Sequence, residues 1–314
     1  MSPDIQIPFI HSFEAIVNQA RAVSRENRPT AALVVPSEID TLRAFVKAAQ
    51  EELIHPLIIG DEKLLRKNLE VNSIELGATH VIDMNQPDMA VQTAARMAKA
   101  GEIDIIVQGK LLAADLLSGL FAPEQEFRVP GKMISHVAVL KTRKYPKLLL
   151  LTDSAVVVQP DLKAKLNLIE NLVYVAGKIG ITNPRIAVVA AVEVIYPQMP
   201  ATMEAAILAK MGERGQIKGA QVDGPLSLDV AVDLFAAHSK GITNSAVAGQ
   251  ADAILAPSIE VANGIYHAMS LYGGCQIGGV VVGGRVPLAV NSHADSVDAR
   301  YNSIVLSILC SQAE

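Results

Sequence analysis

Ser292, Asp295 and Ser296 carry hydroxyl and carboxylate groups between an apolar run at 288–290 and an amphipathic stretch that begins at Val297. The first N–H groups of a helix have no partner within the helix and carry partial positive charge. Hydroxyls and N–H groups at such a turn could therefore hold a phosphate or a developing oxyanion. Helix capping is the alternative, because Ser292 with Asp295, or Ser296 alone, would satisfy the same donors without any chemistry. The sequence leaves both interpretations open.

Polar side chains also follow several other apolar runs. Glu193, Asp223 and Asp153 each lie just after such a run, and Glu260 and Asn263 lie in the segment APSIEVANGIYH. In open α/β sheets, ligands bind outside the carboxyl ends of the strands, so all five are candidates for binding a small molecule. Asp223 and Glu260 could instead cap the helices that follow them, and Glu193 could be a partly exposed turn residue.

Arg128 lies within residues 122–135, where two prolines, a glycine and mixed charges interrupt the regular pattern. Its guanidinium could bind an anion or form a surface ion pair. Further along the chain, Gly283 and Gly284 precede Arg285, and Gly273 precedes another glycine. Such turns could let the backbone approach a phosphate-bearing ligand, although structural glycine turns are common.

Several classes of function are excluded by what the sequence lacks. It contains no HExxH or CxxC spacing and neither of the common glycine-rich nucleotide motifs, so we expect no metal and no bound cofactor. The net charge of −5 and the lack of a basic patch with interleaved aromatics argue against a nucleic-acid partner. Every apolar run is too short to span a membrane, and the N-terminus does not resemble a signal peptide. Two cysteines suit a reducing compartment, and we expect a cytoplasmic protein.

The elements that position these residues alternate from residue 30 onward. Strand-like runs are followed repeatedly by helical patterns, and this βαβ spacing predicts a parallel sheet with helices on its faces. The expected strands cover residues 31–35, 56–59, 81–83, 103–107, 137–140, 148–151, 186–190, 219–222, 253–256, 280–282 and 288–290. The expected helices cover residues 39–50, 62–69, 88–100, 114–120, 162–178, 199–211, 226–237, 259–272 and a last stretch from 297.

The length of 314 residues favours two domains, each large enough to bury its own core. The chain is half apolar and has no Trp, so these cores must consist mainly of Ala, Val, Ile and Leu. The last strand and helix are again α/β, so we expect them to pack on the N-terminal sheet. The first domain would then be discontinuous, formed by residues 1–140 and 285–314, with residues 141–284 as the second.

Beyond these patterns, the sequence resembles the phosphate acetyl/butyryltransferase family, most closely on its butyryl side. The resemblance extends over nearly the whole chain from about Ile105. It is carried by the segments RVPGKMISHVAVL, KLLLLTDSAV, PQMPAT, KMGERGQI, DGPL, PSIEVANG and SHADS.

The resemblance implies reversible transfer of a short, butyryl-like acyl group between coenzyme A and phosphate. Acyl-CoA, CoA, phosphate and acyl phosphate would be its substrates, with coenzyme A a substrate and not a cofactor. It also implies two α/β/α domains with a cleft between them, like isocitrate and isopropylmalate dehydrogenases, and a homodimer formed through the second domain, with an apolar face from about residues 160–280. Acetyl or another acyl preference is an alternative, as is a CoA-binding relative with lost or altered catalysis.

Within this resemblance, Ser292 matches the serine that contacts acyl phosphate, and Arg128 matches the phosphate-binding arginine. In the acetyl branch of the family the base is an aspartate, and the matching position in this sequence is Ala299. The acid or base would therefore be Asp295 or Asp298. Other candidates for binding substrate are Ser296, Glu260, Asn263, Gly283 and Arg285.

The sequence departs from the family at several of these positions. His293 replaces an arginine, and it is either a phosphate contact or a neutral turn histidine. Gln108 replaces a lysine, Leu112 and Ala113 replace a Ser/Thr pair, and Val157 replaces an asparagine. These changes make the expected pocket less polar, and they bear on both the acyl preference and the presence of catalysis.

Overall fold

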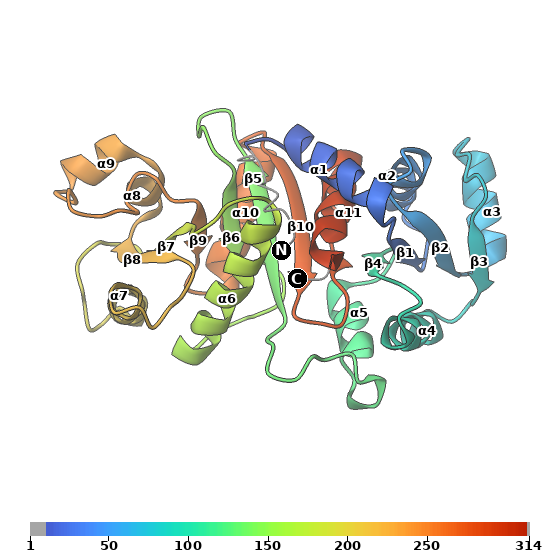
Figure 1. The fold of residues 1–314 in the computed structure, drawn as a ribbon, viewed down its shortest axis with the longest axis horizontal. Coiled ribbons are helices and arrows are strands. Elements are labelled where there is room, and N and C mark those ends of the chain that lie inside the picture. The colour runs from blue at the N-terminus through green and yellow to red at the C-terminus, as the bar shows by residue number, and fades with distance from the viewer. Residues whose placement is uncertain (1–10, 313–314) are drawn as a thin grey trace, which may run out of the picture. The chain divides into compact units, whose positions relative to one another are not determined.

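Residues 11–312 are described by the computed structural model, and their contacts divide the chain into two compact units. The terminal unit combines Phe13–Ile134 with Gln276–Glu314, whereas the central unit is formed mainly by Ser135–Cys275. Each unit consists of hydrogen-bonded strands with helices packed on them, which confirms the predicted α/β class (Figure 1).

In the terminal unit the strand order is β3-β2-β1-β4-β11-β10. β1 pairs in parallel with β2 and β4, and β11 continues this parallel arrangement beside β4, whereas β10 is antiparallel to β11. Leu288 and Ala289 pair with Ile106 and Val107, so the carboxyl ends of β4 and β11 lie side by side. The strands are β1 (Thr30–Val34), β2 (His55–Gly60), β3 (His80–Asp83), β4 (Ile105–Gln108), β10 (Gln276–Val282) and β11 (Leu288–Ala289).

The helices of this unit cover both faces of its sheet. α1, α2 and α11 pack together on one face, and α4 and α5 lie on the other (Figure 1). Every residue of α11 from Ala299 to Cys310 is buried, so the segment leading into it is attached to the core. The helices are α1 (Phe13–Glu26), α2 (Ile39–Gln50), α3 (Glu62–Val71), α4 (Pro87–Ala100), α5 (Ala113–Leu120), the 3-10 helix η1 (Pro123–Gln125) and α11 (Val297–Ser311).

In the central unit the strand order is β5-β6-β9-β7-β8. β6, β9, β7 and β8 are parallel to their neighbours, and β5 is antiparallel to β6. The strands are β5 (Ser135–Lys141), β6 (Leu149–Thr152), β7 (Arg185–Val189), β8 (Gln221–Leu226) and β9 (Ala253–Leu255). The helices are α6 (Leu162–Lys178), α7 (Pro200–Glu213), α8 (Leu228–Val232), α9 (Leu234–Ser239) and α10 (Ile259–Leu271).

The structure corrects the expectation of a wholly parallel sheet. The β5–β6 and β10–β11 pairs are antiparallel because residues 142–148 and 283–287 are too few to form the crossover that a parallel pair requires. The helix expected at 226–237 is also wrong. Leu226 ends β8, and the rest divides at Asp233, whose carboxylate accepts hydrogen bonds from the N–H groups of Phe235 and Ala236 and so caps α9. Helix α1 was not predicted.

Candidate active site

Ser292 lies in the loop between β11 and α11, outside the helix. The N-cap of α11 is Ser296, whose hydroxyl accepts a hydrogen bond from the N–H of Ala299 at 3.2 Å. Capping by Ser296 alone is therefore what the structure shows. The hydroxyl of Ser292 lies 3.4 Å from the N–H of Ala294, at the upper end of hydrogen-bond distance.

The two candidate aspartates differ in their surroundings. Asp295 is 7% exposed, and its Oδ2 accepts hydrogen bonds from the N–H of Ser292 at 2.9 Å and from Nδ2 of Asn291 at 3.1 Å. Asp298 lies in the first turn of α11 with 88% of its side chain exposed, 4.0 Å from Nζ of Lys47. Asp295 therefore closes the loop, whereas the carboxylate of Asp298 faces solvent.

Arg300 was not among the residues that the sequence suggested. It is 3% exposed and donates from Nε to the carbonyl of Asp295, and from one terminal nitrogen to the carbonyls of Ser292 and His293. Its other terminal nitrogen donates to the hydroxyl of Thr41 at 2.6 Å. The signal that could have indicated Arg300 is a charged residue in a helix whose other residues from Ala299 to Cys310 are uncharged.

Gln108 and Asn291 join the carboxyl ends of β4 and β11. Oε1 of Gln108 accepts from the N–H of Asn291 at 3.1 Å, and Nε2 of Gln108 donates to the carbonyl of Leu111 at 2.6 Å. The amide of Asn291 also donates to the hydroxyl of Ser303 at 3.0 Å. Gln108 thus provides a neutral link that fixes the start of the Ser292 loop.

His293 lies beside a carboxylate. Its side chain is 54% exposed, and Nδ1 lies 3.4 Å from Oε2 of Glu38. The other oxygen of Glu38 lies 3.7 Å from the guanidinium of Arg300. Glu38 therefore faces both a buried cation and the imidazole of His293.

Arg128, Gly283 and Arg285 form a second group in the terminal unit. The backbones of Arg128 and Gly284 form an antiparallel bridge, and Arg285 donates from its N–H to the carbonyl of Phe127 and from Nε to the carbonyl of Glu126. Gly283 has φ of +96°, and a Cβ there would collide with the carbonyl of Met133. Gly283 and Arg285 thus support the loop that carries Arg128.

The guanidinium of Arg285 donates a hydrogen bond to a backbone carbonyl, whereas the guanidinium of Arg128 lies over an aromatic ring. Arg128 is exposed, and its guanidinium carbon lies 5.3 Å from the ring centroid of Phe121. A contact with the face of the guanidinium does not use its five N–H donors, which lie in the plane of the group. Among the sequence candidates in this loop, Arg128 therefore has an exposed guanidinium that lies beside an aromatic ring.

Glu260 and Asn263 lie in the central unit, on α10. Nδ2 of Asn263 donates to the carbonyl of Ser154 at 3.1 Å. Glu260 lies in the first turn, and a hydrogen bond from Ser258, the N-cap residue, lowers the pKa of its carboxyl. Glu260 is therefore not the cap, which corrects the capping alternative. The structure places these two residues on one helix and the Ser292 loop in the other unit.

The remaining polar candidates of the central unit have structural partners. Asp153 is buried, and its carboxylate accepts from the N–H groups of His136, Ala155 and Val156. Asp223 lies within β8 and accepts from the hydroxyl of Ser245, so it does not cap a helix. Glu193 accepts from the hydroxyl of Ser227 and from Lys240. These three carboxylates hold loops together.

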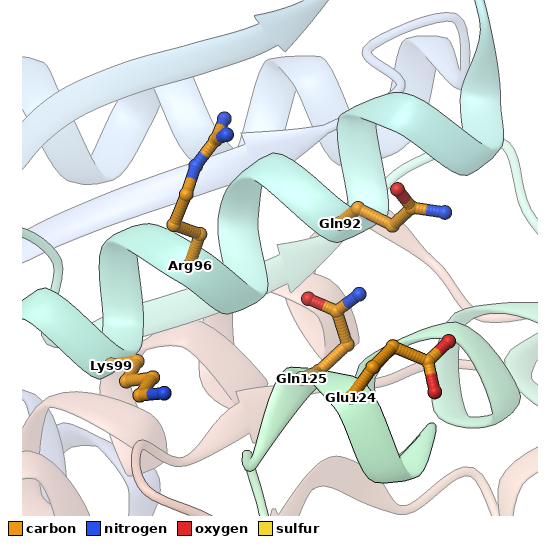
Figure 2. A pocket seen from close by; sticks show the side chains of 5 residues that line it. All are labelled: Gln92, Arg96, Lys99, Glu124 and Gln125. Carbon is orange, nitrogen blue, oxygen red and sulfur yellow. The ribbon is translucent and has the colours of Figure 1, made fainter.

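A pocket of about 250 Å³ lies between α4 and η1, and none of the predicted site residues lines it (Figure 2). Gln92, Arg96 and Lys99 line it from one face of α4, and Glu124 and Gln125 line it from η1. Its charges are largely balanced, since its lining residues include two cations, Arg96 and Lys99, and one carboxylate, Glu124, and Lys99 also pairs with Glu126 at 2.8 Å. The pocket therefore has no marked preference for an anion.

Within residues 11–312 no cluster of three or more His, Cys, Asp or Glu side chains could hold a metal ion. None of the helices in that range is long and apolar enough to cross a membrane.

Comparison with known proteins identifies the family. Residues 85–308 match the family model described as phosphate acetyl/butaryl transferase. The chain is 38% identical to a phosphate butyryltransferase of Clostridium acetobutylicum, covering 96% of this chain and 98% of that protein. It is 35% identical to a phosphate acetyltransferase of Thermotoga maritima, with coverage of 94% and 98%.

A solved structure agrees with these sequence matches. The crystal structure of a branched-chain phosphotransacylase from Enterococcus faecalis superimposes with a TM-score of 0.78 and 25% identity, covering 91% of this chain and all of that one. The chain therefore belongs to the phosphate acetyl/butyryltransferase family, and it is an acyltransferase.

Proposed function

We propose that this protein is a phosphotransacylase that transfers a short, butyryl-like acyl group between coenzyme A and phosphate. The family match and the relatives named above support this activity. The observation that assigns this activity to particular residues is the structure of the Ser292 loop. Asp295 and Arg300 fix the loop on its inner side, and the loop presents the hydroxyl of Ser292. Ser292 and Arg128, both in the terminal unit, would hold the acyl phosphate.

The chemistry requires two groups from the protein. The thiolate sulfur of CoA attacks the acyl carbon, the bond from that carbon to the phosphate oxygen breaks, and phosphate leaves with the electron pair. Hydroxyl and cationic donors stabilise the oxyanion and the leaving phosphate. A base must take the thiol proton, because an ordinary thiol with a pKa of ~8.5 is mostly protonated at pH 7.

We assign the roles of Asp295 and Asp298 from how deeply each side chain is buried. Oδ2 of Asp295 already accepts two hydrogen bonds from the loop, so Asp295 positions Ser292. Asp298 has an exposed carboxylate at the start of α11, and we propose that it accepts the thiol proton. Ser296 is engaged as the helix cap. Glu260 and Asn263 remain candidates for contact with CoA.

A butyryl-like substrate is favoured by an exposed apolar residue. Leu112 is 59% exposed at the N-cap of α5, in the loop after β4 whose Gln108 contacts Asn291. An apolar side chain at this place would pack against the methylene groups of an acyl chain longer than acetyl. Leu112→Thr should therefore shift the preference from butyryl-CoA toward acetyl-CoA.

Homodimer formation through the central unit is part of the proposal. Val194, Ile195 and Tyr196 are all at least half exposed, and Met203 and Ile207 on α7 are exposed as well. The hydroxyl of Thr202 binds the backbone N–H and carbonyl of Tyr196, which holds these residues beside α7. Exposed apolar side chains gathered in this way are typical of an interface. Light scattering that returned a monomer of 33.3 kDa at micromolar concentration would contradict it.

The domain arrangement expected from the resemblance is also proposed. It comprises isocitrate or isopropylmalate dehydrogenase-like domains of residues 1–140 with 285–314 and of 141–284, with a cleft between them. A cytoplasmic location is proposed from the cysteine content, and coenzyme A is proposed as a substrate with no resident cofactor.

The activity is tested by phosphate-dependent release of free thiol from acetyl-, propionyl-, butyryl- and branched acyl-CoA. We expect turnover with phosphate and the highest kcat/KM for a four- or five-carbon acyl group. CoA binding by calorimetry without turnover of any of these substrates would instead identify a binding relative that has lost catalysis. Highest kcat/KM for acetyl-CoA would keep the reaction and overturn the acyl preference.

A further inference from the structure

Arg300 binds the inner side of the Ser292 loop through backbone atoms alone. The carbonyls of Ser292 and His293 each lie 3.2 Å from its Nη2, and the carbonyl of Asp295 lies 3.1 Å from its Nε. Because 4% of the side chain is exposed, the guanidinium is a buried cation whose donors are directed to the loop and to α2. Arg300 cannot touch a substrate on the outer side of the loop.

Because the peptide group is planar, the direction of each carbonyl also fixes the direction of the N–H group that follows it. In a trans peptide the carbonyl and the following N–H point in opposite directions. When Arg300 holds the carbonyls of Ser292 and His293 inward, the N–H groups of His293 and Ala294 point away from the guanidinium. Each carbonyl that accepts from a cation also polarises its own peptide group, which makes the N–H a stronger donor.

The anchor of Arg300 on α2 fixes the loop in the terminal unit. Thr41 is 2% exposed, and its hydroxyl accepts a hydrogen bond from Nη1 of Arg300, while a carboxylate oxygen of Glu38 lies 3.7 Å from Nη2 and balances the charge of the guanidinium. A buried arginine with a nearby carboxylate and satisfied donors holds one geometry, whereas a lysine has one ammonium and could not reach all of these acceptors.

We propose that Arg300 is a positioning residue for the acyl-phosphate site. It orients the N–H of His293, and the hydroxyl of Ser292 that accepts from the N–H of Ala294, toward the oxyanion or the phosphate of the substrate. The inference rests on the proposed function, in which Ser292 contacts acyl phosphate. Arg300 adds to that function a cation that acts from behind the loop.

The test compares Arg300→Met and Arg300→Lys with a matched control, Lys165→Met. Lys165 is also a buried cation, paired with Glu204, but it lies in the central unit on α6. For each full-length protein we would measure kcat and KM for phosphate with butyryl-CoA, the Kd for CoA and the urea midpoint. Turnover would be measured at a temperature where every variant is folded.

We expect both Arg300 variants to lower kcat by ~100-fold, comparable to the loss of one oxyanion donor, with the Kd for CoA changed less than ~3-fold. Lys165→Met should lower the urea midpoint and keep kcat within ~2-fold of the wild type. In Arg300→Ala, millimolar guanidinium ion should restore part of kcat at a temperature where the variant is already fully folded, which a merely structural role would not produce.

The experiment distinguishes failure of the inference about Arg300 from failure of the proposed function. Folded Arg300→Met and Arg300→Lys with wild-type kcat would overturn the role of Arg300. If Ser292→Ala also retained full turnover, the placement of acyl phosphate at this loop would be wrong as well. If Ser292→Ala lost turnover while the Arg300 variants kept it, the proposed function would stand and the inference alone would fail.

Discussion

The carboxylate of Asp295 accepts a hydrogen bond from the backbone N–H of Ser292 at 2.9 Å, and the carbonyl of Ser292 accepts one from the N–H of Asp295 at 3.0 Å. This reciprocal pair closes a tight loop immediately before α11. It fixes the backbone of Ser292 from the side of its own loop, while Arg300 fixes it from the core. The position of the Ser292 hydroxyl therefore depends on two buried charged residues of opposite sign.

Replacing Asp295 should disturb the loop more than the chemistry. Asp295→Asn keeps the shape but presents an amide NH₂ where one of the two carboxylate oxygens stood, so the loop loses charge-assisted acceptance. We expect kcat to fall by roughly 10- to 100-fold and KM for phosphate to rise, at every pH between 6 and 9. Steady-state kinetics across that range would measure both, and an unchanged KM for phosphate would show that Asp295 does not shape the phosphate site.

Replacing Asp298 should instead give a pH-dependent loss. If Asp298 accepts the thiol proton, Asp298→Asn lowers kcat by about 100-fold or more at pH 6.5. The defect should shrink as pH approaches ~8.5, the ordinary pKa of a thiol, since CoA then ionises without a base. A loss that is equal at pH 6.5 and 9 would remove Asp298 from the role of base. Lys47→Met is the companion variant, because it removes the cation 4.0 Å away and leaves the carboxylate in place.

Arg128→Ala should weaken the use of phosphate more than the binding of CoA. The guanidinium is exposed and stands over the ring of Phe121, while Gly283 and Arg285 hold its loop through other contacts. Losing one charged hydrogen bond, about 1.5–3 kcal/mol, corresponds to a roughly 10- to 150-fold rise in KM for phosphate. Arg66→Ala, on exposed α3, is the control and should leave KM unchanged. If Arg128→Ala also leaves KM for phosphate unchanged in a folded protein, Arg128 is only a surface residue.

Much of the fold followed from local patterns, and what did not follow depends on contacts between distant residues. The start of the last helix at Val297 was predicted from apolar spacing. The direction of the strands in the β5–β6 and β10–β11 pairs was predicted wrongly, because hydrophobic periodicity does not depend on strand direction. The short connections within these pairs did indicate that the strands are antiparallel. Helical spacing also gave no sign of the partners of Arg300, since Thr41 lies far away in the sequence.

The candidate site shows the same division. Motifs pointed to Ser292, Asp295 and Asp298 together, but burial alone separates the two aspartates, and burial is set by the packing of α11. His293 was considered as a phosphate contact or a neutral turn residue. Its neighbour, Glu38, lies at the start of α2 and could not be identified from the sequence near position 293.

His293→Arg tests whether a permanent positive charge at position 293, which the resemblance implies, improves the use of acyl phosphate. A guanidinium at this position would first pair with Glu38, which lies 3.4 Å from the present imidazole, so we expect less than about a threefold gain in kcat/KM for acyl phosphate. With Glu38→Gln in addition, the new arginine is released toward phosphate. We then expect about tenfold over Glu38→Gln alone, equivalent to roughly 1.4 kcal/mol. The four proteins form a double-mutant cycle, and a double variant no better than Glu38→Gln would show that position 293 does not face the phosphate.

The acid stability of the central unit should depend on Lys240. The hydroxyl of Ser227, and then Lys240, lower the pKa of Asp229 to about 2. This folded pKa lies below the ordinary ~3.9, so the stabilisation is fully present above pH ~4 and is lost as pH falls from there toward 2. Because 55% of the side chain of Asp229 is exposed, solvent screening keeps the effect small.

Lys240→Met should therefore lower the free energy of unfolding at pH 6, and the difference from the wild type should shrink at pH 3. Urea unfolding followed by circular dichroism measures both values. Lys63→Met, on exposed α3 of the terminal unit, is the control for loss of a surface charge and should give the same small difference at both pH values. A Lys240→Met difference that is identical at pH 6 and pH 3 would show that Lys240 does not hold Asp229 in its ionised form.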